Sequence, residues 1–312
     1  MRIKDLHAGD AFSGFCVLKN AALKQSKQGQ MFLTGMLQDT DGEINALFWD
    51  YSGPISAKDN GSIVYAVGNV GEYRGALQVT LSDIRLRGAD EKVSMGELVP
   101  CAPIDPAQTW RDLIEVIKHI EDEDYRKITV EIIDRYKKVF SVMPAGVSKH
   151  HAFMHGTLMH TFSMVKMALA IADNYTGFVD KSLLVAATIL HDIGKVDELL
   201  LAETCLVKEY SVRGNLIGHL VMGAGYVREA GLKENVPEEK IMLLEHMLLS
   251  HHGQPEYGAA IVPKIAEAQI LSAIDMLDSR MEMFRVALEE TPVGQMSEGP
   301  VNGLGVRVYH HS

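Results

Sequence analysis

The stretch Thr188-Ile189-Leu190-His191-Asp192-Ile193-Gly194-Lys195 organises the fold that we expect for this chain. It completes a run, starting at residue 183, that is apolar on every face, and such a run predicts a helix buried inside the protein. An ionised aspartate at the end of a buried helix is costly unless another charge balances it. A divalent cation, which accepts both nitrogen and oxygen donors, would balance Asp192. We expect Gly194 to end the helix as a C-cap.

The other histidines decide between a metal site and a simple capping pair, which is the usual meaning of a His-Asp dipeptide. Five further donors lie on apolar helix faces or at helix ends: His160, His219, His251, His252 and Asp275. A metal centre in a helical bundle is built by side chains that converge from facing helices. Histidines that only stabilise a core have no reason to recur at such places, so the pattern favours a metal centre.

Length and composition exclude several classes of protein. A chain of 312 residues with 47% apolar residues is long enough for two domains with real cores. It has no run of eighteen apolar residues and starts with mixed charges, so we expect neither a membrane span nor a secretory leader. The three cysteines are far apart and outside any CxxC motif. This spacing suits a reducing cytoplasm and argues against thiolate zinc sites.

The net charge of −11 is unevenly distributed along the chain. Residues 1–90 hold nine Lys and Arg against ten Asp and Glu, whereas the remaining residues hold 21 against 31. The acidic excess therefore belongs to the C-terminal part. A phosphate-binding surface must be local, or it must use metal ions to offset the repulsion.

The first 90 residues predict a small all-β barrel. Short segments rich in β-branched and aromatic residues alternate with turn residues. The expected strands cover residues 11–23, 31–38, 44–49, 62–70 and 76–86. Five such strands, with the longest connection after the third, indicate a closed barrel of the oligonucleotide/oligosaccharide-binding (OB) kind, although other small barrels have similar spacing.

One pair of aromatic residues in this barrel bears on function. Phe48 and Trp49 are adjacent in a strand, so they point to opposite faces and one of them lies outside the barrel. An outward ring near Lys24, Lys27 and Arg74 would form a stacking platform for single-stranded bases. The alternative is that the outer ring packs against a second domain.

The periodicity changes after the barrel. Three prolines within residues 100–106 predict an extended linker over residues 91–108. An all-α domain follows over residues 109–292, and the Gly-rich tail 293–312 has no assigned role. The expected helices cover residues 109–120, 125–140, 157–175, 181–192, 215–230, 238–250 and 264–290. The fold class is therefore multidomain, with an OB-type barrel followed by a helical bundle.

The order of the histidines and aspartates resembles that of the HD-domain metal-dependent phosphohydrolases. The matching residues are His160, His191-Asp192 with Gly194-Lys195, His219, His251-His252 and Asp275. Together with the barrel and Ser250-His251-His252-Gly253, they resemble the YhaM-type 3′→5′ exoribonucleases of Gram-positive bacteria over nearly the whole chain. Two features differ from related patterns: His155-Gly156 stands where the family more often has two glycines, and no Gly-Tyr-Pro motif of the cyclic-dinucleotide branch follows His252.

The resemblance implies a centre of two divalent ions that share Asp192. One ion would be held by His160, His191, Asp192 and Asp275, and the other by Asp192, His219 and His251. Lys195 would contact a phosphate oxygen, and His252 would contact the phosphate or protonate the leaving group. Imidazole and carboxylate ligands favour Mn²⁺, with Co²⁺, Fe or Zn²⁺ as alternatives, over Mg²⁺. Asp278, one turn beyond Asp275, is an alternative ligand, although we expect it to orient one instead. His150 and His151 could reach the mouth of the site, but we expect them to be loop residues.

The resemblance implies a 3′→5′ exonuclease that acts on single-stranded RNA, or also on single-stranded DNA, and releases nucleoside 5′-monophosphates in the cytoplasm, away from membranes. A second hypothesis is an HD-domain phosphohydrolase of small or cyclic nucleotides, in which the barrel serves only for assembly. A third is a non-catalytic nucleic-acid-binding scaffold. The complete ligand set argues against the third, and the oligomeric state stays open.

Overall fold

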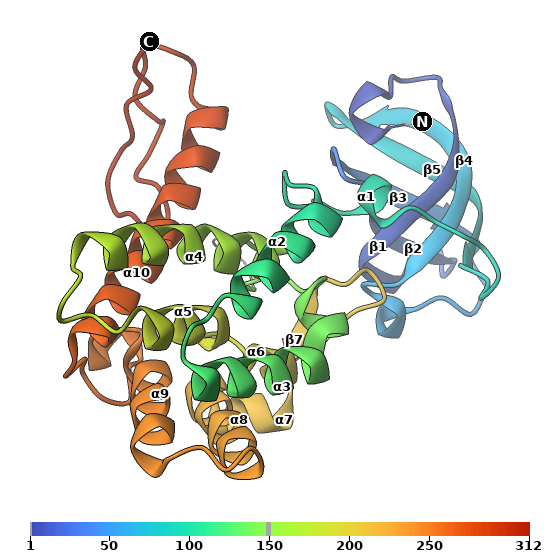
Figure 1. The fold of residues 1–312 in the computed structure, drawn as a ribbon. Coiled ribbons are helices and arrows are strands. Elements are labelled where there is room, and N and C mark those ends of the chain that lie inside the picture. The colour runs from blue at the N-terminus through green and yellow to red at the C-terminus, as the bar shows by residue number, and fades with distance from the viewer. Residues whose placement is uncertain (1, 148–150) are drawn as a thin grey trace. The chain divides into compact units, whose positions relative to one another are not determined.

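The computed structural model describes residues 2–147 and 151–312. The chain divides into two compact units, which are described separately (Figure 1). The first unit contains Met1–Cys101 together with Leu201–Lys208, and the second contains Ala102–Leu200 together with Glu209–Ser312. The chain therefore returns to the first unit for a short segment in the middle of the second.

The first unit is a closed barrel whose strands follow the order β1-β2-β3-β5-β4. Its strands are β1 (Ala11–Gln25), β2 (Met31–Gln38), β3 (Glu43–Trp49), β4 (Ile63–Tyr73) and β5 (Ala76–Leu86). The long strand β1 pairs with β4 through its first half and with β2 through its second half, and its register with β2 shifts between Lys19 and Ala22. This is the five-stranded arrangement of an OB-fold, so the predicted barrel is confirmed.

Alternate residues of the strands fill the barrel. Leu18, Leu33, Leu37 and Val79 are almost completely buried in one apolar cluster, as the period of two requires. The short 3₁₀ helix η1 (Ile3–Asp5) adds Ile3 to this cluster. A second 3₁₀ helix, η2 (Ala57–Asp59), lies in the long connection between β3 and β4.

The segment between the barrel and the helical unit differs from the extended linker that we expected over residues 91–108. It contains the short helix α1 (Met95–Leu98), and α2 (Pro106–Lys118) begins before residue 109. The Asp105 side chain accepts hydrogen bonds from the backbone N–H groups of Ala107 and Gln108. Pro106 has no N–H to satisfy at the first helical position, so the prolines that predicted an extended chain instead include a helix start.

The second unit is a bundle of helices, joined to one small hairpin whose tip, Leu201–Lys208, belongs to the first unit. Its helices are α3 (Glu123–Phe140), α4 (Gly156–Asn174), α5 (Lys181–Leu190), α6 (Lys195–Glu198), α7 (Val212–Ile217), α8 (His219–Lys233), α9 (Glu238–Ser250), the 3₁₀ helix η3 (Pro255–Tyr257) and α10 (Ala266–Glu290). The strands β6 (Leu199–Leu201) and β7 (Val207–Tyr210) form the hairpin. Within the described ranges, the structure contains no helix with the length and apolar character needed to span a bilayer.

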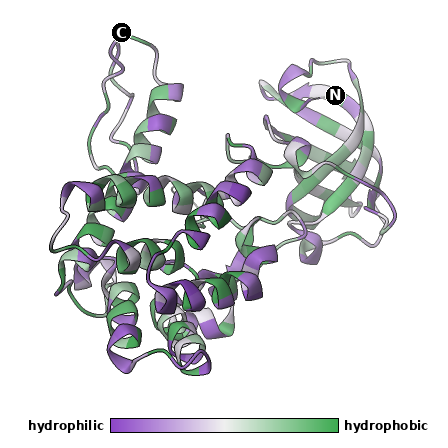
Figure 2. Cartoon of the chain, viewed as in Figure 1, coloured by the Kyte–Doolittle hydropathy of each residue, from purple (hydrophilic) through white to green (hydrophobic). Residues whose placement is uncertain are grey.

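Helix α5 is the centre of the bundle. Every residue from Leu183 to Leu190 is buried, and α5 contacts α3, α4, α9 and α10. Hydrophobic residues lie on the sides of the helices that face one another, and hydrophilic residues lie on their outer sides (Figure 2). The prediction of a buried helix before His191 is therefore confirmed.

The tail after α10 is folded. Met296 pairs with Tyr309 in an isolated antiparallel bridge, and the Nδ1 atom of His310 donates to the Thr291 carbonyl oxygen at 2.6 Å. These contacts fold the tail back toward the end of α10. The structure adds no role for the tail beyond this packing.

Candidate metal centre and strand-binding face

The helical unit brings together the six residues that the sequence proposed as metal ligands. Asp192 and His191 directly follow the end of α5, and His251 directly follows α9. The others lie within helices: His160 in α4, His219 at the start of α8 and Asp275 in α10. Side chains from distant parts of the chain therefore converge at the buried end of α5.

The first half of the centre is formed around His160. Its Nε2 atom lies 3.3 Å from the Nε2 atom of His191 and 3.3 Å from Asp275 Oδ1. The Nε2 atom of His191 lies 3.4 Å from Asp192 Oδ2. Two donors that bind one ion at about 2.1 Å and at a right angle lie about 3 Å apart. The spacing of these atoms therefore fits a shared divalent ion.

The second half of the centre is formed around the other oxygen of Asp192. Asp192 Oδ1 lies 3.7 Å from His219 Nε2 and 3.8 Å from His251 Nε2. These three buried atoms have no hydrogen-bond partner among the residues that the structure describes. Buried polar atoms are nearly always hydrogen-bonded. Three buried nitrogen and oxygen atoms without such bonds, facing one another, are therefore better explained as ligands of a metal ion than as part of an ordinary protein core.

The ring orientations suit metal binding as well. In each of the four histidines the Nδ1 atom faces an acceptor outside the centre. The acceptors are the Thr188 carbonyl for His191 (2.8 Å), the Leu248 carbonyl for His251 (2.8 Å), Asp278 for His160 (2.7 Å) and Glu198 for His219 (3.0 Å). A carbonyl or carboxylate oxygen can only accept, so each ring carries a proton on Nδ1, and in its neutral form each ring turns the Nε2 lone pair to the centre.

Lys195 balances the charge of Asp192. Its Nζ atom donates to Asp192 Oδ2 at 2.6 Å and to the Ala145 carbonyl oxygen at 2.7 Å. Burial alone would raise the pKa of Asp192, but the Lys195 ammonium holds this pKa well below its usual range. The carboxylate is therefore ionised at neutral pH, as a metal ligand must be.

Gly194 has a different role from the one that we predicted. Helix α5 ends at Leu190, and Gly194 has an ordinary right-handed conformation with φ −63° and ψ −20° just before α6. A Cβ atom on Gly194 would lie 2.1 Å from the His219 carbonyl oxygen. The glycine is therefore needed for a close approach to the start of α8, and the C-cap prediction is wrong.

The helix predicted over residues 215–230 is interrupted. Gly218, with φ +77° and ψ 157°, separates α7 from α8, a conformation that favours glycine. The break places His219 at the first position of α8. Leu216 is 80% exposed, so the apolar residues just before His219 do not form a buried helix face.

Asp278 and His151 lie behind His160, on the side of its ring that faces away from the centre. Asp278 Oδ2 accepts hydrogen bonds from His160 Nδ1 at 2.7 Å and from His151 Nε2 at 2.9 Å. Burial raises the pKa of Asp278, but these two histidine contacts hold it below its usual range. His151, which we expected to be an ordinary loop residue, is buried behind the centre, and His150 lies outside the described residues.

His252 lies beside the second half of the centre. Its ring and those of His219 and His251 each offer one nitrogen, and these three nitrogens lie within 4.8 Å of one another. Nδ1 of His252 is buried and has no hydrogen-bond partner among the described residues. His252 is therefore placed to contact whatever binds at the centre.

Of Phe48 and Trp49 on the barrel, Trp49 is the residue that faces outward. It is 48% exposed, and its ring lies 5.1 Å from that of Phe32 on the neighbouring strand. Phe48 instead packs against the barrel core and contacts Tyr51. Of the two adjacent rings, Trp49 is therefore the one on the outer face, because alternate residues of β3 point to opposite faces.

Strand pairing places exposed Trp49 and half-buried Phe32 in one row. Lys24 of β1 is opposite Phe32 of β2, which is opposite Trp49 of β3. Phe32 was not predicted, because its position beside Trp49 depends on the register between two strands. The row lies on the sheet face through which OB-folds bind oligonucleotides.

Of the basic residues that we proposed for this face, Lys24 lies in β1 and the other two lie in the adjoining loops. Lys27 lies in the β1–β2 turn, and Arg74 lies in the β4–β5 turn with its guanidinium 5.2 Å from the Tyr73 ring. Among the described residues, Lys24, Lys27 and Arg74 have no acidic partner. Lys19, Arg85 and Arg87 are paired with Glu43, Glu91 and Glu203. The first three are therefore available to phosphate groups.

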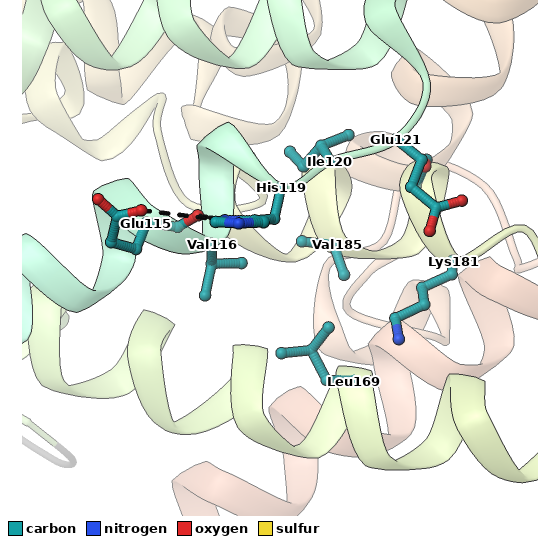
Figure 3. A pocket seen from close by; sticks show the side chains of 9 residues that line it. Glu115, Val116, His119, Ile120, Glu121, Leu169, Lys181 and Val185 are labelled. Atoms are coloured by element: carbon teal, nitrogen blue, oxygen red, sulfur yellow. Dashed lines mark hydrogen bonds and ion pairs between the residues drawn. The ribbon is translucent and has the colours of Figure 1, made fainter.

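A separate cavity of about 310 Å³ lies between α2, α4 and α5. Figure 3 shows Val116, Leu169 and Val185 around it and Lys181 at its edge. Lys181 donates to Asp173 at 2.6 Å. The cavity and the metal centre are formed by different residues.

Comparisons with known proteins agree with this architecture. Residues 157–280 match the family model for the HD domain. The chain is 33% identical over 297 residues to the 3′-5′ exoribonuclease YhaM of Bacillus licheniformis, covering 93% of this chain and 91% of that protein. It is 32% identical over 311 residues to the protein of the same name from Listeria monocytogenes, covering 99% and 98%.

Among solved structures, the second OB-fold domain of replication protein A from Methanococcus maripaludis aligns with 30% of this chain and 98% of that domain. The sequence identity is 16% and the TM-score is 0.24. The assignment to a family rests instead on the sequence relatives, whose identity exceeds 30% over nearly their whole length. With an OB-type barrel, an HD domain and relatives matched from end to end, the chain belongs to the YhaM 3′→5′ exoribonuclease family.

Proposed function

We propose that this protein is a metal-dependent 3′→5′ exoribonuclease that releases nucleoside 5′-monophosphates, with single-stranded DNA as a second substrate. The observation that supports this most strongly is the group of buried, unpaired atoms on Asp192, His219 and His251. The adjoining group of His160, His191 and Asp275 supports a second ion. The names of the relatives support the choice of RNA and the direction of digestion.

The two ions would be held by the residues on either side of Asp192. His160, His191, Asp192 and Asp275 would bind one ion, and Asp192, His219 and His251 would bind the other. When bound, such ions supply a hydroxide at neutral pH and a counter-charge for the phosphoryl oxygens. The imidazole and carboxylate donors favour Mn²⁺, with Co²⁺, Fe or Zn²⁺ as alternatives.

The side chains of the site have distinct roles in this proposal. Asp192 presents one oxygen to each half of the centre, which suits a bridging ligand. Lys195 uses two of its three N–H donors on Asp192 and Ala145, and we assign the third to a phosphate oxygen. His252 contacts the phosphate or the leaving oxygen through its unpaired Nδ1 atom.

The reaction shortens the strand by one nucleotide. The oxygen of a water molecule bonds to the phosphorus of the last nucleotide, and the bond between this phosphorus and the O3′ atom of the preceding nucleotide breaks. O3′ keeps the electron pair and takes a proton. The products are a strand with a new 3′-hydroxyl and a nucleoside 5′-monophosphate.

The barrel holds the single strand in this proposal. Bases stack on Trp49 and Phe32, and phosphates pair with Lys24, Lys27 and Arg74. Aromatic stacking tolerates any base, because every base has a π-face. Such a face suits an enzyme that must digest strands of many sequences.

The test is product analysis on 5′-labelled single-stranded RNA with added Mn²⁺. We expect a ladder of products that shorten from the 3′ end, together with 5′-mononucleotides, and no digestion without a divalent ion. A DNA strand of the same sequence measures the preference for the sugar. Hydrolysis of mononucleotides or cyclic nucleotides without digestion of strands would contradict the proposal and support a small-nucleotide hydrolase.

A further inference from the structure

Glu198, a buried acidic residue at the end of α6, lies outside the proposed ligand set. It is 8% exposed, and its contact with the His219 ring is the only feature of it described above. A buried carboxylate needs donors that compensate for lost water. Glu198 Oε1 accepts from the backbone N–H of His219 and from His219 Nδ1, both at 3.0 Å.

The backbone around this contact is closely packed. A Cβ atom on Gly214 would lie 2.4 Å from the Glu198 carbonyl oxygen. Ser211 also binds this segment, since its backbone N–H donates to the same carbonyl at 2.8 Å. On the other side, Gly194 approaches the carbonyl of His219. Glu198 and His219 are therefore held in fixed positions by the backbone on both sides.

His219 needs such support more than His191 and His251 do. His191 and His251 directly follow helices, and the carbonyl three residues earlier orients each ring. His219 is the first residue of α8, so no preceding turn of its own helix offers a carbonyl to its ring. The acceptor must come from elsewhere in the chain, and Glu198 is the residue that supplies it.

We infer that Glu198 is a positioning residue that fixes the ring of His219 for the second divalent ion; this inference rests on the proposed function. By accepting the Nδ1 proton it selects the tautomer whose Nε2 lone pair faces Asp192 Oδ1, 3.7 Å away. Carboxylates behind ligating histidines generally contribute a factor of about 10–100 to metal affinity. Because Glu198 also accepts the first backbone N–H of α8, it fixes both the helix start and the ring.

The test compares Glu198→Ala, Glu198→Gln and the control Glu209→Gln, which changes an exposed acid on β7. Binding of Mn²⁺ is measured by calorimetry, with metal content determined in parallel. We expect Glu198→Ala to bind the second equivalent about 10–100-fold more weakly. Glu198→Gln, which keeps an acceptor oxygen, should recover part of the affinity. Glu209→Gln should match the wild type.

A second readout uses metal-free protein and does not depend on the ions. Nitrogen–proton correlation spectra of the imidazole rings report the His219 tautomer, which should change from Nδ1–H to a mixture in Glu198→Ala. An unchanged tautomer together with wild-type affinity in Glu198→Ala would overturn the inference. A wild-type protein that binds no divalent ion would instead contradict the proposed function, while the tautomer would still decide the role of Glu198.

Discussion

Asp192 lies in two different environments through its two carboxylate oxygens. Oδ2 accepts from the buried ammonium of Lys195, whereas Oδ1 faces two histidine nitrogens without a hydrogen bond. Lys195 and Asp192 are both largely buried, with side-chain exposures of 15% and 4%. Removing one member of a buried pair leaves the other charge uncompensated. Activity and stability are therefore linked at this residue.

We expect Asp192→Asn to abolish hydrolysis of RNA and to lower the free energy of unfolding by about 3–5 kcal/mol, because the Lys195 ammonium loses its counter-charge. The double variant Asp192→Asn with Lys195→Met should recover much of this stability without recovering activity. Denaturant unfolding and digestion assays measure the two effects. A single variant that digests RNA at the wild-type rate would refute the role of Asp192.

Gly194 and Gly225 give a matched pair of glycines. A Cβ atom on Gly194 would meet the His219 carbonyl oxygen, whereas one on Gly225, within α8, would meet nothing within 4 Å. We expect Gly194→Ala to destabilise the protein by about 1–3 kcal/mol and to weaken metal binding. Gly225→Ala should stabilise it by about 0.5–1 kcal/mol. Thermal unfolding measures both, and equal effects would argue against the close approach at Gly194.

Among the elements of the structure, α3 and α9 are joined by a small ionic cluster. Lys240 of α9 donates to Asp122 at 2.6 Å and to Asp124 at 2.7 Å. Asp122 also caps the start of α3. Burial raises the pKa of Asp122, but Lys240 and the backbone N–H groups of α3 lower it below its usual value. Its stabilising effect is therefore present above the unfolded-state pKa and is lost as the pH falls.

We expect Lys240→Met to lower the free energy of unfolding by about 0.5–1 kcal/mol at pH 7, where Asp122 is ionised. The difference from the wild type should shrink as the pH falls below about 3.9, the usual pKa of an aspartate, because protonated Asp122 no longer attracts Lys240. Urea unfolding at a series of pH values measures this difference. A constant difference between pH 7 and about pH 3 would mean that packing, and not charge, joins the two helices.

On the barrel, neighbouring residues of β3 should respond differently to the same substitution. Trp49→Ala and Phe32→Ala should each weaken binding of single-stranded RNA by about 1–3 kcal/mol per stacked base. Phe48→Ala, which removes a ring that packs against the core, should instead lower barrel stability by about 1–3 kcal/mol. Fluorescence anisotropy and thermal unfolding separate the two effects. Unchanged RNA affinity in both Trp49→Ala and Phe32→Ala would remove this face from the proposal.

At the scale of the whole molecule, the sequence predicted those features that depend on chain order and local pattern. The apolar run before His191 predicted a buried helix, and the order of the histidines and Asp275 indicated the family. Other features depend on contacts between distant residues. The role of Gly194 depends on a carbonyl 25 positions later, and Phe32 joins Trp49 only through strand register. One sequence contains no local signal for such contacts.

Removing divalent ions should affect the whole molecule as well as the reaction. Burial of the unpaired atoms on Asp192, His219 and His251 is unfavourable, and part of this free energy is recovered only when an ion binds. A ligand that binds only the folded state, at a free concentration 100 times its dissociation constant, stabilises that state by about 2.7 kcal/mol. We therefore expect Mn²⁺ to raise the melting temperature and chelation to lower it, as calorimetry would measure. A melting temperature that is independent of Mn²⁺ would contradict the proposed centre.

The outward position of Trp49 also gives the protein a built-in optical reporter. The chain has only two tryptophans, and the other, Trp110, is half-buried in α2 of the helical unit, where its ring meets Phe140. In a Trp110→Phe background all indole emission would come from the exposed barrel ring. Quenching by an arriving nucleobase would then follow strand capture in real time, without a dye on either molecule.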